Sequence, residues 1–237
     1  MASKARLFYS KELKTGIISE LSKKQSHYIK SVMRLKPGET ISLFNSLNGE
    51  WEATILTHGN DTTKFKVQKQ SKPLKKENNL WLAFSPIKKI PQDMMLQKTT
   101  ELGIQKFFPI LCERSIVRAI NVERAKKIVT EASEQSNRIS VPEILPIQDL
   151  GKFIKNFTEN ANLIFCDINC KSNDLKNIFL SNCPTCILIG PEGDFSESER
   201  QMIINHKKTT SIYLAKNILR AETAAIAATT ILSFNLK

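Results

Sequence analysis

Ile187-Leu-Ile-Gly-Pro-Glu-Gly-Asp-Phe195 is an apolar, β-branched run that breaks into a loop, and Leu214-Ala-Lys-Asn-Ile-Leu-Arg-Ala-Glu-Thr-Ala-Ala225 follows it along the chain. The first stretch is typical of a buried parallel strand that leads into a backbone-rich loop. The second repeats this order, because a strand predicted over 211–214 leads into a polar loop and an alanine-rich helix that begins near Arg220. Two such units predict a small-molecule site at the carboxyl ends of the strands, although either loop alone could be an ordinary turn.

Composition and charge describe a globular chain with a polyanionic partner. Of its 237 residues, 41% are hydrophobic and 24% are charged, which suits one large or two modest domains. The formal net charge is +12, and residues 1–72 carry 13 Lys and Arg against 6 Asp and Glu, compared with 22 against 17 in residues 73–237. The excess points to a polyanionic partner and is concentrated in the N-terminal third, although net charge alone also fits a basic protein with no such partner.

The first residues, Met1-Ala-Ser-Lys-Ala-Arg-Leu-Phe8, have no apolar core of the kind that a signal peptide contains. No stretch approaches the roughly 18 consecutive apolar residues that a membrane-spanning helix needs. The sequence therefore predicts a soluble, cytoplasmic protein with no membrane partner.

The cysteines leave a zinc site open as an alternative. Cys166 and Cys170, and likewise Cys183 and Cys186, have spacings that resemble pairs of zinc ligands. Because Cys166 ends one predicted strand and Cys186 begins another, buried thiols are the simpler interpretation. We therefore expect no metal.

The first 72 residues predict a compact β-barrel with a basic outer face. A helix is expected over 22–33, and the polar, proline-bearing segment 71–79 is expected to be a linker. Short alternating runs predict strands at 6–9, 41–44, 51–56 and 64–68.

Residues 73–237 predict an α/β domain. Apolar runs indicate strands at 80–84, 106–111, 163–166 and 186–189. Helical spacing, a capping box at Ser196-Glu-Ser-Glu199 and the terminal Gly103 indicate helices at 91–102, 121–137, 196–206 and 221–232. This alternation is typical of a mostly parallel sheet covered by helices.

The two loops match no common phosphate or hydrolase motif. Gly190-Pro-Glu-Gly193 lacks the Lys-Ser/Thr of a P-loop, no Gly-x-Gly-x-x-Gly follows a strand, and no Gly-x-Ser-x-Gly or His-Glu-x-x-His occurs. What remains is a backbone-rich site with Glu192, Arg220, Glu222 and Thr223, which could bind an adenosine-like ligand in an apolar pocket.

Gly190-Pro-Glu-Gly193 together with Leu219-Arg-Ala-Glu-Thr-Ala224 resembles the 16S ribosomal RNA (uridine-N3)-methyltransferase family of the SPOUT superfamily. Further matching stretches occur in the right order over nearly the whole chain: Arg6–Phe8, His27-Tyr28 with Val32–Arg34, Gln97-Lys98 with Glu101–Gly103, Glu113–Ser115, and Glu134–Arg138.

The resemblance implies a PUA-like, RNA-binding N-terminal barrel (1–72) and a trefoil-knotted SPOUT methyltransferase domain (73–237) that forms a homodimer. It implies S-adenosyl-L-methionine as cofactor and 16S ribosomal RNA, within the small ribosomal subunit, as substrate. By motif match, the cofactor-binding residues would be Ile189, Gly190, Glu192, Gly193, Leu214, Asn217, Ile218, Leu219, Arg220 and Thr223.

The chain departs from the family pattern in both loops. Family members usually have a second glycine where Asp194 stands, and a glycine with a nearby arginine where Ala215-Lys216-Asn217 stand. These departures put loop detail and cofactor affinity in doubt, but not the class of reaction.

The expected chemistry assigns roles to two residues. N3 of uracil must lose a proton while charge spreads onto O2 and O4, so a carboxylate and a guanidinium are both useful. We expect Arg220 to stabilise the uracil anion and Glu222 to act as base or organiser, although Glu222 could instead be a first-turn carboxylate that favours its helix.

For RNA, phosphate contacts are expected from Arg6, Lys30 and Arg34, and base stacking from His27 and Tyr28, unless His27 is partly buried and structural. Arg114 and Arg138 are further RNA candidates or ordinary salt-bridge partners, and Gln97, Lys98 and Glu101 form either a site wall or a solvated helix face. Two other functions stay open, a non-catalytic RNA-binding assembly factor and a methyltransferase of another RNA.

Overall fold

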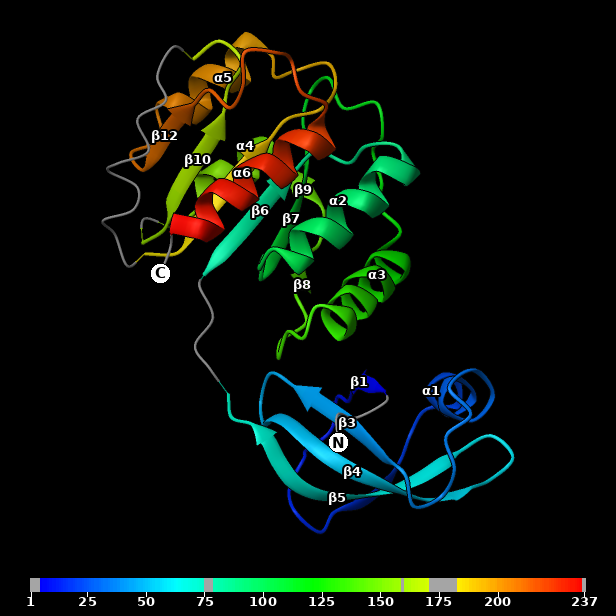
Figure 1. Ribbon diagram of the computed structural model, residues 1–237. Helices are drawn as coiled ribbons and strands as arrows, with labels where there is room; N and C mark the ends of the chain where they lie inside the picture. Colours follow the sequence, from blue (N-terminus) through cyan, green and yellow to red (C-terminus); the bar gives the residue numbers. More distant parts are fainter. Residues whose placement is uncertain (1–4, 75–78, 159, 171–182, 236–237) are drawn as a thin grey trace. The chain divides into compact units, whose positions relative to one another are not determined.

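The computed structural model describes residues 5–74, 79–158, 160–170 and 183–235 (Figure 1). Its contacts divide the chain into two compact units. One unit comprises Met1–Lys76 together with Ser133–Val141, and the other comprises Glu77–Ala132 together with Pro142–Lys237. The expected combination of a small β-rich unit and an α/β unit is confirmed.

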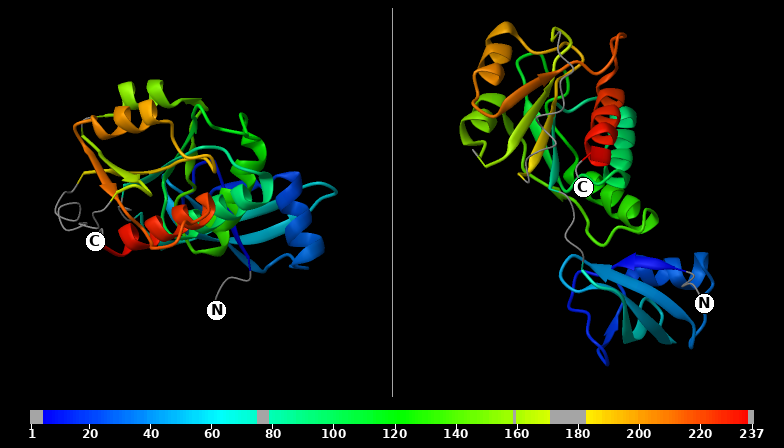
Figure 2. Two further views of the ribbon diagram at one scale, coloured as in Figure 1. Left: turned by 90° about the horizontal axis from the view of Figure 1, so that it is seen from above. Right: turned by 60° about the vertical axis from the view of Figure 1, so that its left-hand side comes forward.

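The first unit is a five-stranded sheet that curves around its own core. The strands in spatial order are β1 (Arg6–Phe8), β3 (Thr40–Asn45), β4 (Gly49–His58), β5 (Thr63–Lys72) and β2 (Ile18–Glu20). Only β1 and β3 are parallel, and the pairing of β4 with β5 shifts register at three points, where irregular pairing bends a strand. The strands curl into a barrel-like shape (Figure 2). Fully buried side chains such as Leu43, Ile55 and Phe65 belong to its core.

The helical segment of this unit is not a regular α-helix. After the N-cap Ser22, α1 (Lys23–His27) continues directly into a π-helix, η1 (Tyr28–Val32), in which the amide of Met33 donates to the carbonyl of Tyr28 at 2.9 Å. Arg34, just beyond, has φ of +53°. The helix predicted over 22–33 is therefore present in extent but changes type, and π-turns and left-handed non-glycine residues recur at functional sites.

Residues 133–141 belong to this unit, and the Arg6 side chain binds three of their carbonyl groups. The Arg6 guanidinium donates to the carboxylate of Glu50 at 2.9 Å, to the carbonyls of Ser133 and Glu134 at 2.9 and 3.2 Å, and to the carbonyl of Arg138. It also lies 3.7 Å from the centre of the Phe44 ring. A cation at a helix C-terminus satisfies free carbonyls and favours the helix dipole.

The second unit is built on a parallel sheet with the strand order β12-β10-β11-β6-β7-β8, with β9 also paired to β7. The strands are β6 (Leu80–Phe84), β7 (Lys106–Leu111), β8 (Glu143–Ile144), β9 (Gln148–Asp149), β10 (Asn162–Cys166), β11 (Thr185–Ile189) and β12 (Thr209–Ile212). The helices are α2 (Lys89–Glu101), α3 (Val122–Gln135), α4 (Leu150–Asn156), α5 (Glu197–Ile204) and α6 (Ala221–Asn235).

Helices cover both faces of this sheet. The helices α2 and α6 pack against each other, and α6 also packs against β11, whereas α4 and α5 pack together on the opposite face (Figures 1 and 2). Every residue of β11 is buried, as expected for a central strand covered on both sides.

The structure corrects several expected boundaries. The strand expected at 211–214 lies at Thr209–Ile212, because Thr209 and Ile212 pair with Leu163 and Cys166 of β10. The linker expected at 71–79 begins after β5, which includes Ser71 and Lys72, and residues 75–78 lie outside the described part. The short elements α4, β8 and β9 were not predicted. Residues 171–182 lie outside the described part of the chain, and the trefoil knot stays a prediction.

Candidate functional site

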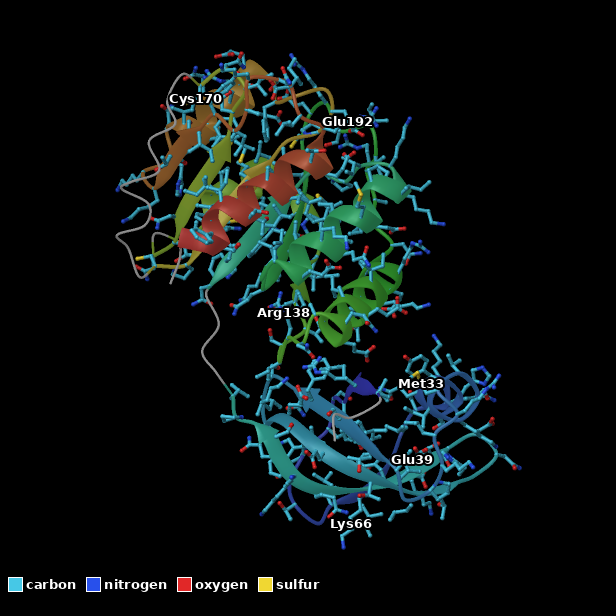
Figure 3. The ribbon with its side chains drawn as sticks, viewed as in Figure 1. Met33, Glu39, Lys66, Arg138, Cys170 and Glu192 are labelled. Carbon is cyan, nitrogen blue, oxygen red and sulfur yellow. The ribbon has the colours of Figure 1, made fainter. Side chains whose placement is uncertain are left out.

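The two quoted loops leave the same edge of the sheet. Because β10, β11 and β12 are parallel, their carboxyl ends lie at one edge, and β11 and β12 are separated only by β10. At about 4.8 Å per strand, the two loops begin about 10 Å apart. After β12 the chain returns to α6, which begins at this edge and packs against β11 (Figure 1). Figure 3 shows Glu192 on the first loop, beyond the strand ends.

The first loop approaches its neighbours so closely that two positions exclude a side chain. A Cβ atom on Gly190 would lie 2.6 Å from the ring of Phe195, a buried side chain that packs edge-on against Phe165. A Cβ atom on Gly193 would lie 3.3 Å from the Cβ atom of Arg114. The loop therefore presents backbone rather than side chains at these two points.

Asp194 stands where family members usually have a second glycine, and its backbone conformation accounts for the substitution. Its φ is +59°, in the left-handed region that glycine adopts most easily. Asp tolerates this region better than most residues because its short side chain bonds locally. Here its carboxylate accepts from the amide of Phe195 at 2.8 Å, and its own amide donates to the carbonyl of Pro191 at 3.0 Å. The departure therefore leaves the backbone turn intact.

The second loop places Arg220 and Glu222 at the start of α6. The amide of Ala224 donates to the carbonyl of Arg220 at 2.8 Å, so Arg220 occupies the N-terminal end of the helix. A cation is unfavourable at that end of a helix dipole. Arg220 is exposed, and within the described residues its guanidinium has no acceptor. Stability of the helix therefore does not explain this arginine.

Glu222 is largely covered, since only 8% of the residue is exposed. In the described part of the chain no donor or cation reaches its carboxylate, and its oxygens are not among the fully buried atoms that lack a hydrogen-bond partner. The carboxylate therefore keeps some contact with solvent. The remaining expected residues of this loop, Leu214, Asn217, Ile218 and Leu219, precede Arg220, with Ile218 85% exposed, and Thr223 lies exposed in the first turn of α6.

A third segment, the loop after β7, joins the site. Arg114 in this loop donates to the carbonyl of Gly193 at 3.2 Å, although the two residues are 79 positions apart. The motif match placed Arg114 among the RNA candidates, but no periodicity in the sequence indicates this contact with the first loop. In contrast, Lys98 and Glu101 form an ion pair at 2.9 Å on α2, and Gln97 is exposed beside them, as on a solvated helix face.

The basic candidates of the first unit separate into two groups. Arg6 is only 11% exposed and its donors bind Glu50 and three carbonyls, so the contacts that the structure shows for it are structural, and its RNA contact stays a prediction. Arg138 is also buried, and it donates to the hydroxyl of Ser140 at 3.0 Å. By contrast, His27, Lys30 and Arg34 are exposed along α1 and η1, and Tyr28 packs against the barrel core.

Ion pairs also distinguish the lysines of β5 from the basic residues of the helical segment. On β5 the lysines Lys64, Lys69 and Lys72 each lie within 3.5 Å of a glutamate carboxylate, so that strand is largely neutralised. Among the described residues, no carboxylate pairs with Lys24, Lys30, Arg34 or Lys36. The helical segment and the turn after it therefore carry four cations without a carboxylate partner, whereas on β5 Lys66 is the one lysine without such a partner in the described chain.

A hollow of about 390 Å³ lies beside the start of α2, and no sequence pattern indicated it. Its lining includes Ile87, Gln92 and Leu96, together with segment 117–121 and the Arg124–Asp93 ion pair. This volume is within the range of small-molecule pockets.

Cys112 and Cys186 are buried, Cys166 and Cys170 are half-buried, and Cys183 is exposed. Burial raises the pKa of Cys112 to about 12, with the negative charge of Glu199 as a second cause, and burial also raises the pKa values of Cys166 and Cys186. Within the described ranges, no three His, Cys, Asp or Glu side chains are grouped as metal ligands. In the same ranges, no helix combines the length and the apolar character that crossing a bilayer demands.

Comparison with known families supports the same two-part organisation. An RNA methyltransferase domain model matches residues 74–233, and an RNA methyltransferase PUA domain model matches residues 21–67. Ribosomal RNA small subunit methyltransferase E of Rickettsia conorii is 37% identical over 207 residues, which are 85% of this chain and 83% of the relative.

Solved structures agree over almost the full length. The crystal structure of ribosomal RNA small subunit methyltransferase E from Neisseria gonorrhoeae, bound to S-adenosyl methionine, is similar with a TM-score of 0.89 and 27% identity, covering 97% of both chains. A methyltransferase from Legionella pneumophila, in complex with SAM, has a TM-score of 0.87 and 25% identity, covering 99% of this chain and 98% of the other.

We expect Gly190→Ala to destabilise the second unit by about 1–3 kcal/mol, since the new methyl group must displace the buried Phe195 ring. The matched control is Gly151→Ala in α4, where the nearest atom would be 3.9 Å away and the alanine favours the helix. Urea unfolding measures both. Equal stability of the two variants would contradict the close packing at Gly190.

Proposed function

Since the chain belongs to the ribosomal RNA small subunit methyltransferase E family of RNA methyltransferases, we propose that it methylates N3 of a uridine in 16S ribosomal RNA. Methyl transfer to 16S ribosomal RNA from S-adenosylmethionine is the function that membership implies. The target atom, the site residues and the dimer are our proposals. The observation that supports the chemistry best is that Glu222, only 8% exposed, and the exposed Arg220 stand together at the start of α6 with no partner in the described chain.

The loops at the sheet edge suit the cofactor. The first loop offers backbone amides and carbonyls from Ile189 to Gly193, where glycines keep side chains out of the way. We assign to it Ile189, Gly190, Glu192 and Gly193, and to the second loop Leu214 and 217–220, with Thr223 from α6. S-adenosylmethionine supplies an electrophilic methyl group when bound. Arg114 would fix the Gly193 carbonyl in place.

The protein's own part in the reaction is positioning and charge. N3 lies on the Watson–Crick edge of uracil, so the base must be unpaired or extruded before it can react. Glu222 would accept the N3 proton, because its carboxylate has a free lone pair and no competing donor in the described chain. Arg220 would stabilise the negative charge that develops on O2 and O4.

RNA binding would fall to the helical segment of the first unit. Lys30 and Arg34 carry free positive charge for phosphates, and His27 is exposed for stacking on an unpaired base. Because Tyr28 packs against the core, its share in stacking would be limited to its exposed edge.

A homodimer is supported by apolar exposure on the two helices that pack together. Ile90 and Met94 of α2 are 82% and 43% exposed, and Phe234 of α6 is 75% exposed. Large exposed apolar side chains of this kind are common at interfaces between subunits.

The direct test is to incubate the protein with labelled S-adenosylmethionine and unmodified small subunits, and then to identify the methylated nucleoside. We expect N3-methyluridine. A different methylated nucleoside would refute the target atom, and bound cofactor without methylation of any RNA would favour a non-catalytic assembly factor.

Glu222→Gln should lower turnover by about 10²–10⁴-fold with nearly unchanged cofactor affinity, because the amide cannot take the proton. If Glu222 only favours its helix, the variant loses about 0.3–1 kcal/mol of stability and keeps wild-type turnover. Single-turnover methylation and calorimetric titration separate these outcomes. Glu197→Gln, an exposed first-turn change in α5, is the control.

Lys30→Ala and Arg34→Ala should each weaken RNA binding and reduce the slope of log affinity against log salt by about one. The control is Lys69→Ala, since Lys69 already pairs with Glu52 at 3.5 Å. Filter binding over a salt series provides the slopes. Equal slopes in all three variants would remove η1 from the RNA-binding surface.

A further inference from the structure

We propose that Glu199 is a positioning residue that couples the loop after β7 to the first cofactor loop, so that both move as one unit. This inference rests on the proposed function for the identity of the ligand. Its structural half, the coupling of the two loops, can be tested without any ligand.

Glu199 is buried in the first turn of α5, with 5% exposure. One carboxylate oxygen accepts from the amide of Ser196 at 3.0 Å, which completes a capping box at the start of its own helix. The other oxygen accepts from the amide of Glu113 at 2.8 Å, across 86 positions of sequence. A capping box needs only the first bond, so the second bond is an addition specific to this site.

Two further contacts join the same loops. The guanidinium of Arg114 donates to the carbonyl of Gly193 at 3.2 Å, and the hydroxyl of Ser198 donates to the carboxylate of Glu113 at 3.3 Å. Gly193 lacks a side chain where the Cβ atom of Arg114 approaches. Contacts from Gly193, Ser198 and Glu199 therefore reach the two consecutive residues Glu113 and Arg114.

Hydrogen bonds of two buried serine side chains also fix the loop after β7. The buried hydroxyl of Ser115 accepts from the amide of Cys112 at 2.9 Å and lies 2.7 Å from the hydroxyl of Ser85. The amide of Ser85 donates to the carbonyl of Ile189, the last residue of β11, at 3.2 Å. The ends of β6, β7 and β11 are thus connected by one chain of hydrogen bonds. Glu199 adds a connection between the loop after β7 and Ser196, the residue that follows the first loop.

A carboxylate is suited to this role because both of its oxygens accept hydrogen bonds. Glutamine has one acceptor oxygen and one donor nitrogen, so it cannot serve the amides of Ser196 and Glu113 together. The change Glu199→Gln keeps the size of the side chain and removes one of the two bonds. Since Glu199 contacts no expected cofactor residue directly, any effect on the ligand must pass through the loops.

Amide hydrogen exchange tests the coupling. In Glu199→Gln we expect faster exchange in both 112–115 and 190–194, with wild-type exchange in β10. Glu197→Gln should change neither loop, because Glu197 is exposed and only accepts from Gln201 at 2.9 Å. Unchanged exchange at 112–115 in Glu199→Gln would overturn the proposal, as would faster exchange throughout the second unit.

Titration with S-adenosylmethionine tests the consequence. We expect Glu199→Gln to weaken binding at least about tenfold, because small misplacement of positioned groups is costly. Wild-type affinity in a variant with loosened loops would show that the coupling serves no ligand. If the wild-type protein itself bound no S-adenosylmethionine, the proposed function would fail, while the exchange experiment would still decide the coupling.

If Glu199→Gln does not fold, Arg114→Ala provides a second test at an exposed residue. Its loss should accelerate exchange at 190–194 and leave β10 unchanged. Wild-type exchange in that loop would contradict the inference.

Discussion

The parallel pairing of β12, β10 and β11 is the constraint on which the rest of the structure depends. It brings the carboxyl ends of three strands to one edge, and it separates two loops by a single intervening strand. A small molecule can be held between such loops largely by backbone groups. This arrangement explains why the site contains glycines and few charged side chains, and why α6 must begin at the same edge to bring Arg220 and Glu222 to it.

Electrostatics divides labour between the two units. In the first unit, glutamate carboxylates form ion pairs with most lysines of β5, and Arg6 forms an ion pair with Glu50 and donates hydrogen bonds to carbonyls at 133–138. Cations without a carboxylate partner in the described chain include Lys24, Lys30, Arg34 and Lys36 on the helical segment and the turn after it. In the second unit, Arg220 and Glu222 at the start of α6 have no partner among the described residues. In the function that we propose, the helical segment binds RNA and the start of α6 serves the reaction.

The sequence predicted the elements that depend on interactions between residues close together along the chain. The apolar runs at 80–84 and 106–111 match β6 and β7 residue for residue, and the capping box at Ser196 forms as expected. Long-range contacts could not be predicted from the chain. Nothing local in Glu199 distinguishes its bond to Glu113 from an ordinary capping box, and nothing in Arg6 indicates that carbonyls at 133–138 will occupy its donors. The π-turn at Tyr28–Val32 was not predicted either, because the residue types there do not distinguish a π-turn from an α-turn.

The attachment of residues 133–141 to the barrel has a consequence for biosynthesis. When residue 76 has just been added to the nascent chain, the carbonyls that Arg6 binds have not yet been made. At typical rates of translation the ribosome reaches Ser133 roughly 3 to 11 seconds later. During that interval Arg6 has Glu50 but lacks the three carbonyls that complete its contacts. The N-terminal unit therefore reaches its final form only after much of the second unit has been synthesised, so its folding in the cell does not simply follow the order of the chain.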